Sequence, residues 1–310
     1  MKDMEGKVAL ITGGSSGVGA AVGLVFAKRG AKVVLAARRV KEGEAAAQAV
    51  CEAGGEAIFV QADVSDAAQV RAMVEAAVAR FGRLDYAFNN AGIEGVVGRT
   101  AECAFENWNQ TMAVNLKGVW LCLKYEIAQM LKQGSPLVAL GRVEGTYSLP
   151  PRGGKVKDGG ETSPPPQSSP LNGEEVSRSP RPSPSEHTTG YAIVNMSSGN
   201  GIFGGAGLPA YVATRHAVVG LTKSAALEYA DKGIRINSVC PGSIRTPMHY
   251  RLYGLTKPQA EADQVIGDMH PAGRIATPEE VAEAAAWLCS DAASYVNGHA
   301  LLMDGGWGAR

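Results

Sequence analysis

The sequence lacks the features that would mark a membrane protein or a general nucleic-acid-binding protein. No apolar run approaches the ~18 residues needed to cross a membrane, and the first residues carry no long apolar stretch of the secretory-signal type. Lysine and arginine together number 30 and are balanced by 30 aspartates and glutamates, whereas nucleic-acid binding needs a basic face. We therefore expect neither a membrane nor a nucleic acid among the partners.

Cysteine is also scarce, and its spacing argues against two further kinds of structure. The cysteines are odd in number, scattered and without a CxxC pair, so a disulfide scaffold and a zinc site are both unexpected. We expect no bound metal, and a reducing, cytoplasmic compartment. The five residues are Cys51, Cys103, Cys122, Cys240 and Cys289.

What the chain does contain is typical of a globular protein, apart from one segment. Hydrophobic residues make up 45% of the 310 residues and charged residues 19%. Residues 135–190 differ, because they hold ten of the 16 prolines and keep neither a helical nor a strand-like apolar period. We interpret them as a disordered Pro/Ser/Gly-rich insertion, with a proline-rich docking site for a partner as the alternative. Residues 1–134 plus 191–310 then form a single domain.

Outside that insertion, short apolar runs alternate with segments of helical period. Strands are predicted at Lys7–Thr12, Lys32–Ala36, Ala57–Gln61, Leu84–Phe88, Ala192–Met196, Ile234–Val239 and Ala300–Met303. Helices are predicted at Gly17–Arg29, Val40–Ala53, Asp66–Phe81, Phe105 to about Lys132, Pro209–Ala230 and Pro278–Ser290, the last with Thr277 as N-cap and Glu280 three residues later. This alternation predicts a Rossmann-type, doubly wound α/β fold: a seven-stranded parallel sheet with helices on both faces.

A glycine-rich turn, Thr12 to Gly19 (TGGSSGVG), joins the first predicted strand to the first predicted helix. Glycines there let the backbone approach a pyrophosphate, whose charge would face the free N–H groups at the positive end of the helix. An ordinary turn is the alternative. The position after the first strand of an alternating chain favours dinucleotide binding.

Together with this turn, several short motifs resemble those of the short-chain dehydrogenase/reductase family. Tyr211 stands four residues before a basic residue, Arg215, and Ser198 stands thirteen residues before Tyr211. The resemblance covers essentially the whole chain outside 135–190. It implies an NAD(P)-dependent oxidoreductase that transfers a hydride between a nicotinamide and a small-molecule carbonyl or secondary alcohol. The other matching motifs are TGxxxGxG in the glycine turn, Asp63-Val64, Asn89-Asn90-Ala91-Gly92, Asn115 in VNLKG, Ser197-Ser198 and Pro241-Gly242.

The resemblance also implies a catalytic set. Tyr211 would be the general acid/base, and a fixed cation one helical turn away would stabilise its phenolate form. Ser198 would hold the substrate oxygen, and Asn115 would hold a proton-relay water. The sequence departs from the family pattern YxxxK, because Arg215 replaces the lysine. Since a guanidinium cannot release a proton at working pH, we expect turnover to be impaired more than cofactor binding.

The residues after the second predicted strand favour NADP(H) over NAD(H). Ala37 stands where NAD-preferring relatives tend to carry a carboxylate, and Arg38 and Arg39 follow, which suit a ribose 2′-phosphate. A solvated basic pair is the alternative, and the family's other basic marker falls on Ser16 and is missing. The expected cofactor-binding residues are Gly13, Ser15, Ser16, Gly17, Val18, Gly19, Arg38, Arg39, Asp63, Val64, Asn90, Ala91, Gly92, Tyr211, Arg215, Pro241, Gly242, Ile244 and Thr246.

Residues 243–275, after the sixth predicted strand, are expected to form a substrate loop or lid, with Gly254 and Gly267 as hinges. Four side chains are candidates for contact with the substrate: Glu94, just after the Asn89–Gly92 tetrad, and Met248, His249 and Tyr250 in the lid. The resemblance further implies a homo-oligomer, either a tetramer or a dimer.

A second hypothesis belongs to a different functional class. The chain could be a catalytically impaired dinucleotide-binding protein that acts through partners. Arg215 and the proline-rich residues 135–190 are the features that favour it.

Overall fold

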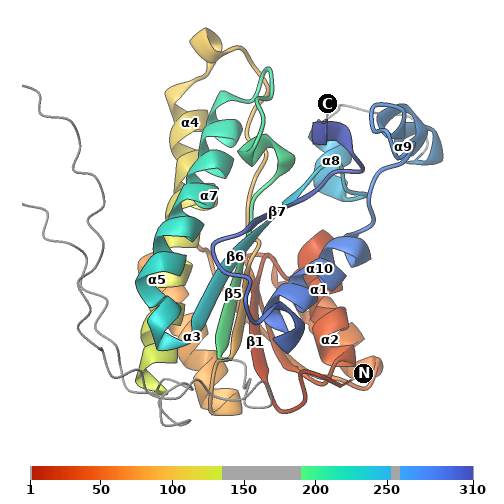
Figure 1. Cartoon of the computed structure of the whole chain (residues 1–310). Coiled ribbons are helices and arrows are strands. Elements are labelled where there is room, and N and C mark those ends of the chain that lie inside the picture. Colours follow the sequence, from red (N-terminus) through yellow and green to blue (C-terminus); the bar gives the residue numbers. More distant parts are fainter. Residues whose placement is uncertain (1, 135–189, 253–258, 310) are drawn as a thin grey trace, which may run out of the picture.

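Seven strands form one parallel sheet in the computed structural model, which describes residues 2–134, 190–252 and 259–309 (Figure 1). The spatial order is β3-β2-β1-β4-β5-β6-β7. All seven predicted strands are confirmed, because short apolar runs that helices cover on both faces extend readily as parallel strands. Their bounds are β1 Val8–Thr12, β2 Lys32–Ala37, β3 Glu56–Gln61, β4 Tyr86–Asn89, β5 Tyr191–Met196, β6 Ile234–Pro241 and β7 Ala300–Met303.

Helices cover both faces of the sheet, as the doubly wound prediction requires (Figure 1). One face carries α1 (Gly17–Lys28), α2 (Val40–Glu52) and α10 (Pro278–Cys289). The other face carries α3 (Ala67–Phe81), α4 (Phe105–Met112), α5 (Gly118–Lys132) and α7 (Pro209–Tyr229). Two short helices, α8 (Pro247–Leu252) and α9 (Gln259–Gly267), follow β6 and lie beyond the carboxyl end of the sheet.

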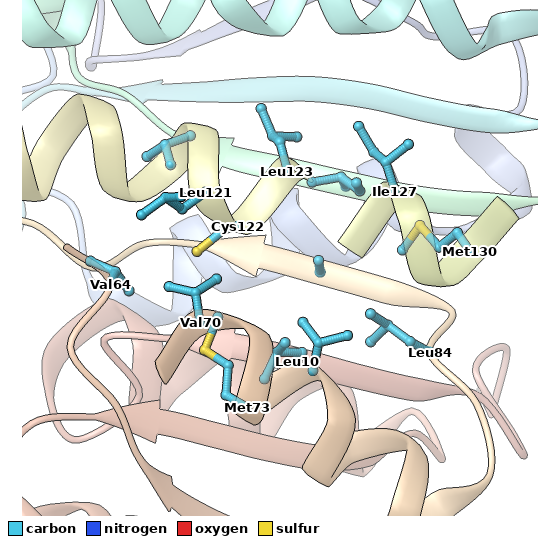
Figure 2. Close-up of a cluster of buried hydrophobic side chains, with 14 of the residues drawn as sticks. Leu10, Val64, Val70, Met73, Leu84, Leu121, Cys122, Leu123, Ile127 and Met130 are labelled. Carbon is cyan, nitrogen blue, oxygen red and sulfur yellow. The ribbon is translucent and has the colours of Figure 1, made fainter. Parts of the chain in front are cut away.

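Two buried apolar clusters hold these layers together, one on each face of the sheet. Figure 2 shows part of the first, in which Val70 and Met73 of α3 and Leu121 and Cys122 of α5 gather near Leu10 of β1. The second cluster packs α1 and α10 against the opposite face. Because each large side chain that leaves water contributes about 1.5–3 kcal/mol, these two clusters supply the main driving force for docking the helices on the sheet.

The winding direction of the sheet reverses at β1. The chain first moves outward from β1 to β3 and then returns to place β4 on the other side of β1. The loops that leave β1 and β4 therefore separate and open a crevice at the carboxyl ends of the strands. Ligands of such sheets bind in this crevice, so the topology alone indicates where the site lies.

The N-cap signature of α10 is confirmed. The Thr277 hydroxyl accepts a hydrogen bond from the Glu280 N–H (3.3 Å), and the Glu280 carboxylate accepts one from the Thr277 N–H (2.9 Å).

The single helix expected from Phe105 to about Lys132 differs from the structure. It consists of two α-helices joined by a π-helical turn, Ala113–Lys117. Such a turn inserts one residue into the helical ladder. The inserted turn contains Asn115, whose amide bonds to the backbone of Ile93, a tertiary contact that the local period cannot indicate.

Arg235, the second residue of β6, is a buried arginine with a full set of acceptors. It donates four hydrogen bonds of 2.6–3.2 Å to main-chain carbonyls at the end of α10 and in the turn that follows. These bonds fasten α10 to the amino end of the sheet. The acceptors belong to Leu288, Cys289, Ser290 and Ala293.

Glu126 of α5 is a buried carboxyl between helix and sheet. One of its oxygens accepts a hydrogen bond from Asn89 Nδ2 at 2.9 Å. Its other oxygen and Asn89 Oδ1 have no hydrogen-bond partner among the described residues. Burial raises the pKa of Glu126 to about 8.

A hydrogen bond joins the two chain flanks of the predicted insertion. Gly134 follows α5 and Tyr191 begins β5, and the Tyr191 hydroxyl donates a hydrogen bond to the Gly134 carbonyl at 3.0 Å. This point is at the amino end of β5, opposite the crevice. Residues 135–189 themselves lie outside the described residues, as does the predicted hinge Gly254.

Within the described ranges, no helix is long and apolar enough to span a membrane. All five cysteines are free. The compartment expected from their spacing stays a prediction.

Candidate active site

The crevice at the carboxyl ends of the strands is a cleft of about 450 Å³. Its walls come from the loops after β1 to β6, from the start of α7 and from α8. It brings together the predicted site residues except Gly19, Asn115, His249 and Tyr250. The predicted residues that line it are Gly13, Ser15, Ser16, Gly17, Val18, Arg38, Arg39, Asp63, Val64, Asn90, Ala91, Gly92, Glu94, Ser198, Tyr211, Arg215, Pro241, Gly242, Ile244, Thr246 and Met248.

The glycine turn after β1 fits a pyrophosphate. A Cβ on Gly13 would stand 2.6 Å from Asn90 Nδ2, and one on Gly19 would collide with the Gly13 carbonyl oxygen, so neither position admits a side chain. Gly17 has a φ of +56°, which favours glycine. Ser16, the N-cap of α1, makes no side-chain cap hydrogen bond. The first N–H groups of α1 therefore face the cleft uncapped, which suits an anionic phosphate.

Two arginines lie beside this turn. Arg39 Nη2 donates to Ser16 Oγ at 2.7 Å and to Ser15 Oγ at 3.1 Å. Arg38 Nη1 is 3.9 Å from the Asp63 carboxylate, and its side chain is 59% exposed. One end of the cleft thus combines two guanidinium groups with two hydroxyls, a donor set suited to a phosphate ester.

Tyr211 and Arg215 lie one turn apart on α7. The guanidinium carbon of Arg215 is 4.7 Å from the centroid of the Tyr211 ring, so the cation stacks on the phenol. Arg215 is only 3% exposed, and its Nη1 donates to the Met196 carbonyl at 2.9 Å. Its Nε has no hydrogen-bond partner within the described part of the chain. An unpaired buried donor costs stability. Arg215 therefore carries one N–H group next to Tyr211 that the described part of the fold does not satisfy.

Gly92 leaves the space that this arginine occupies. A Cβ at Gly92 would stand 2.6 Å from Arg215 Nη2 and 3.2 Å from Asn115 Oδ1. A side chain there would displace the guanidinium. The glycine of the Asn89–Gly92 tetrad is therefore tied to the side chain at position 215.

The two serines after β5 have different partners. The Ser197 hydroxyl is buried and donates to the Arg215 carbonyl at 2.9 Å. The Ser198 oxygen accepts a hydrogen bond from the Asn200 N–H at 3.2 Å and lines the cleft. Because accepting leaves the Ser198 O–H free to donate, Ser198 stays our candidate for holding the substrate oxygen.

Two asparagines clamp the segment that follows Gly92. Asn115 exchanges two hydrogen bonds with the backbone of Ile93, both at 2.8 Å. Asn107 of α4 does the same with Val96, at 2.8 and 3.2 Å. Glu94 stands between the clamped residues, lines the cleft and forms an ion pair with Arg251. The relay role implied for Asn115 stays a prediction.

The lid region is held by hydrogen bonds of its own. Asp263 of α9 accepts from the Tyr250 hydroxyl at 2.6 Å and from Arg245 Nε at 2.7 Å. His249 is half-buried, and that burial lowers its pKa to about 4. Met248 lines the cleft, whereas Tyr250 and His249 do not.

One charged residue of the cleft wall, Arg251, is not among the residues predicted from the sequence. Its Nε donates to Glu94 Oε1 at 3.0 Å, across 157 residues of sequence. A usable signal existed, because Arg251 follows Met248 by three residues and therefore shares a face of α8 with it.

Family models match both halves of the chain. One, described as short chain dehydrogenase, matches residues 7–149. Another, described as enoyl-(acyl carrier protein) reductase, matches residues 181–308.

Individual proteins match nearly the whole chain. A 2,5-dichloro-2,5-cyclohexadiene-1,4-diol dehydrogenase of Sphingobium indicum is 34% identical over 309 residues, which cover 100% of both chains. A cyclohexanol dehydrogenase of an Acinetobacter species is 36% identical over 301 residues, which cover 97% of this chain and 94% of the relative. The solved structure of levodione reductase is 32% identical and covers 99% of each chain with a TM-score of 0.78. With the parallel sheet and the cleft described above, these matches show that the chain belongs to the short-chain dehydrogenase/reductase family.

Proposed function

We propose that the protein is an NADP(H)-dependent oxidoreductase that interconverts a secondary alcohol and a ketone on a six-membered carbon ring. The observation that carries the proposal is the placement of Tyr211, Ser198 and Arg215 in the same cleft as the glycine turn. Two relatives, a cyclohexanol dehydrogenase and a 2,5-dichloro-2,5-cyclohexadiene-1,4-diol dehydrogenase, support the ring as substrate class.

The side chains divide the chemistry between them. The bound nicotinamide supplies or accepts the hydride. In the reducing direction, the Tyr211 hydroxyl gives its proton to the carbonyl oxygen, and in the oxidising direction the phenolate takes the proton back. The Ser198 hydroxyl donates a hydrogen bond to the same oxygen and stabilises the charge that develops there. The cation of Arg215 stabilises the phenolate form of Tyr211.

Arg215 sets a limit on this chemistry. It supplies positive charge but cannot pass on a proton, so Tyr211 must exchange protons with the solvent without help from position 215. We expect Arg215→Lys to raise the rate of ketone reduction while the Kd for NADPH changes less. An unchanged reduction rate in a folded Arg215→Lys variant would show that the arginine is not limiting.

The preference for NADP(H) rests on the donor set at the far end of the cleft. Arg38, Arg39 and the Ser15 and Ser16 hydroxyls would meet a ribose 2′-phosphate, and Ala37 offers no carboxylate to a free ribose hydroxyl. Fluorescence titration with NADPH and NADH tests this preference. Arg38→Ala should weaken NADPH binding by about tenfold and leave NADH binding nearly unchanged. Equal losses for both dinucleotides would contradict the preference.

The decisive experiment is a cofactor-consumption screen. NADPH oxidation is followed with cyclohexanone and with a panel of open-chain and ring ketones, on the natural protein beside Arg215→Lys. We expect the ring ketones to be reduced fastest. Turnover of open-chain ketones alone would overturn the substrate class.

One observation favours a second function, that of a dinucleotide-binding protein that acts through partners. The Arg215 guanidinium is stacked on the ring of Tyr211 and holds the Met196 carbonyl, an arrangement that can support binding without efficient turnover. Tight NADPH binding without turnover of any panel member, in the natural protein and in Arg215→Lys alike, would favour this function.

We also propose a homo-oligomer. An apolar groove on the face of α4, α5 and α7 contains Trp108 and Trp120, which are 38% and 45% exposed. Exposed aromatic patches of this kind mark protein interfaces. The same groove of a second copy of the chain would pack against this one and cover it. Size-exclusion chromatography with light scattering should give a dimer or tetramer, and Trp120→Glu should give monomers. A monomeric natural protein would exclude the proposal. The other apolar side chains of the groove are Met112, Ala113, Leu116 and Leu221.

A further inference from the structure

A charge pair lies in the wall of the cleft that also holds Tyr211. Arg251 Nε of α8 donates to Glu94 Oε1 at 3.0 Å, and both residues line the cleft. Glu94 is two residues after Gly92, and Gly92 is in contact range of the guanidinium that stacks on Tyr211. The pair therefore lines the same cleft as Tyr211 and Arg215.

Hydrogen bonds from neighbouring elements fix the backbone segments that carry Glu94 and Arg251. The Glu94 side is fixed by the paired hydrogen bonds of Asn115 to Ile93 and of Asn107 to Val96. The Arg251 side is fixed through its neighbour Tyr250, whose hydroxyl donates to Asp263 at 2.6 Å. Preorganised supports of this kind hold a side chain where its charge can act on a ligand.

The two members differ in their contact with water. The Glu94 side chain is 19% exposed, whereas that of Arg251 is 62% exposed. The carboxylate is thus the partner that a ligand in the cleft would meet in a water-poor environment, where charges interact more strongly. The more exposed guanidinium of Arg251 neutralises the negative charge of Glu94 from the side that faces the solvent.

From this arrangement we infer that the Glu94–Arg251 pair selects for uncharged substrates, an inference that rests on the proposed function. As a neutral pair, it offers an anionic substrate no net attraction, and the half-buried carboxylate of Glu94 repels a carboxylate placed beside it. Removing one member converts the pair into a fixed charge of one sign. The sign of that charge should then decide which ligands bind.

Two ring ligands of the same shape test the inference without turnover. Cyclohexanecarboxylate is an anion and cyclohexanecarboxamide is its neutral counterpart. Their Kd values are measured by calorimetry on the full chain saturated with the nicotinamide dinucleotide that it binds more tightly. The quantity compared is the affinity for the anion divided by the affinity for the amide.

Three variants give an ordered series. Glu94→Gln leaves Arg251 alone and should raise the anion-to-amide ratio at least about tenfold. Arg251→Gln leaves Glu94 alone and should lower the ratio by a similar factor. The double variant carries no charge, so its ratio should lie between those of the two single variants and above that of the natural protein, because the repulsion by Glu94 is gone. Because these are screened interactions, the differences should shrink in about 0.5 M NaCl.

A merely structural role for the pair predicts another result. If the ion pair only fastens α8 to the cleft, both single variants should weaken the two ligands equally and leave the ratio unchanged. That outcome, or a ratio that shifts in the same direction in both single variants, would overturn the inference.

A turnover measurement separates this inference from the proposed function. Cyclohexanone and 4-oxocyclohexanecarboxylate are compared as substrates of the same proteins. An absence of turnover with both ketones, together with the ordered binding series, would contradict the proposed function and leave the charge selection supported. If Glu94→Gln turns over the ketones with the same preference for cyclohexanone over 4-oxocyclohexanecarboxylate as the natural protein, the proposed function is supported. The proposed selection against charged substrates is then overturned.

Discussion

The two ends of the sheet each hold a buried arginine, and the two are used differently. At the amino end, Arg235 gives four hydrogen bonds to main-chain carbonyls around the end of α10. At the carboxyl end, Arg215 gives one to the Met196 carbonyl, lies on the Tyr211 ring and keeps Nε without a partner in the described residues.

The difference teaches how to distinguish a structural cation from a functional one. A buried charge must be compensated, and at Arg235 the fold itself provides the compensation. At Arg215 the fold provides only part of it and leaves a donor beside a tyrosine in a cleft. The guanidinium that the fold satisfies less fully is thus the one that we propose for chemistry.

The sharpest test of this comparison is Arg215→Met. We expect kcat for ketone reduction to fall about 10³-fold, because the phenolate of Tyr211 loses its cation. The melting temperature should not fall, since methionine removes an incompletely paired charge. Steady-state NADPH oxidation and thermal melting measure the two effects. A folded variant with undiminished kcat would mean that Arg215 is only structural.

Arg235→Met is the matched substitution at the other end of the sheet. It would leave the carbonyls at the end of α10 without a buried donor, so the free energy of unfolding should drop by about 3 kcal/mol. The kcat of the molecules that remain folded should stay unchanged. Urea unfolding followed by circular dichroism gives the first quantity. Loss of activity without loss of stability would remove the contrast between the two arginines.

Glu126 sharpens the comparison, because a buried carboxyl, unlike an arginine, can become neutral. Its folded-state pKa of about 8 lies above the ordinary value of 4.5, so the folded protein binds a proton that the unfolded chain releases. The stability from this group is complete below about pH 4.5 and is lost as the pH rises towards about 8.

Glu126→Gln should remove that pH dependence. The amide could donate to Asn89 Oδ1, which has no partner in the described structure, while it still accepts from Asn89 Nδ2. We expect the stability advantage of the variant over the natural protein to be about 4 kcal/mol larger at about pH 9 than at about pH 5. Urea unfolding at both pH values measures this. Parallel stability curves for the two proteins would contradict the burial argument.

Gly92→Ala gives the smallest expected effect and tests whether Arg215 depends on the space beside it. The new methyl would press on Arg215 Nη2, so kcat should fall about tenfold, or about 1.4 kcal/mol in the activation free energy. In an Arg215→Lys background the same alanine should cost less, since lysine has no guanidinium at that place. Equal losses in both backgrounds would show that Gly92 serves the backbone alone.

Most of the fold could be predicted from the sequence because its signals are local. Ala300–Met303 was predicted to the residue, and the other strands to within two residues at either end, since apolar runs end at glycines and polar turns. Thr277 and Glu280 form a capping box that predicts the start of α10 from four consecutive residues. Where a structural element is determined by residues adjacent in sequence, the sequence is sufficient to predict it.

The parts of the site that were missed depend on contacts between distant segments. The pairing of Glu94 with Arg251 joins residues 157 apart. The π-helical turn at Asn115 and the clamp at Asn107 have no local signature, because each exists to hold the loop after β4. The orientation of the Arg215 guanidinium also followed only from its surroundings.

The meeting of Gly134 with Tyr191 at the end of the sheet opposite the cleft has a practical consequence. A reporter domain or an anchoring tag could be joined to the molecule at this junction. The mouth of the pocket would then remain turned toward the solution. Anyone who wishes to immobilise this catalyst on a support has a natural point of attachment there.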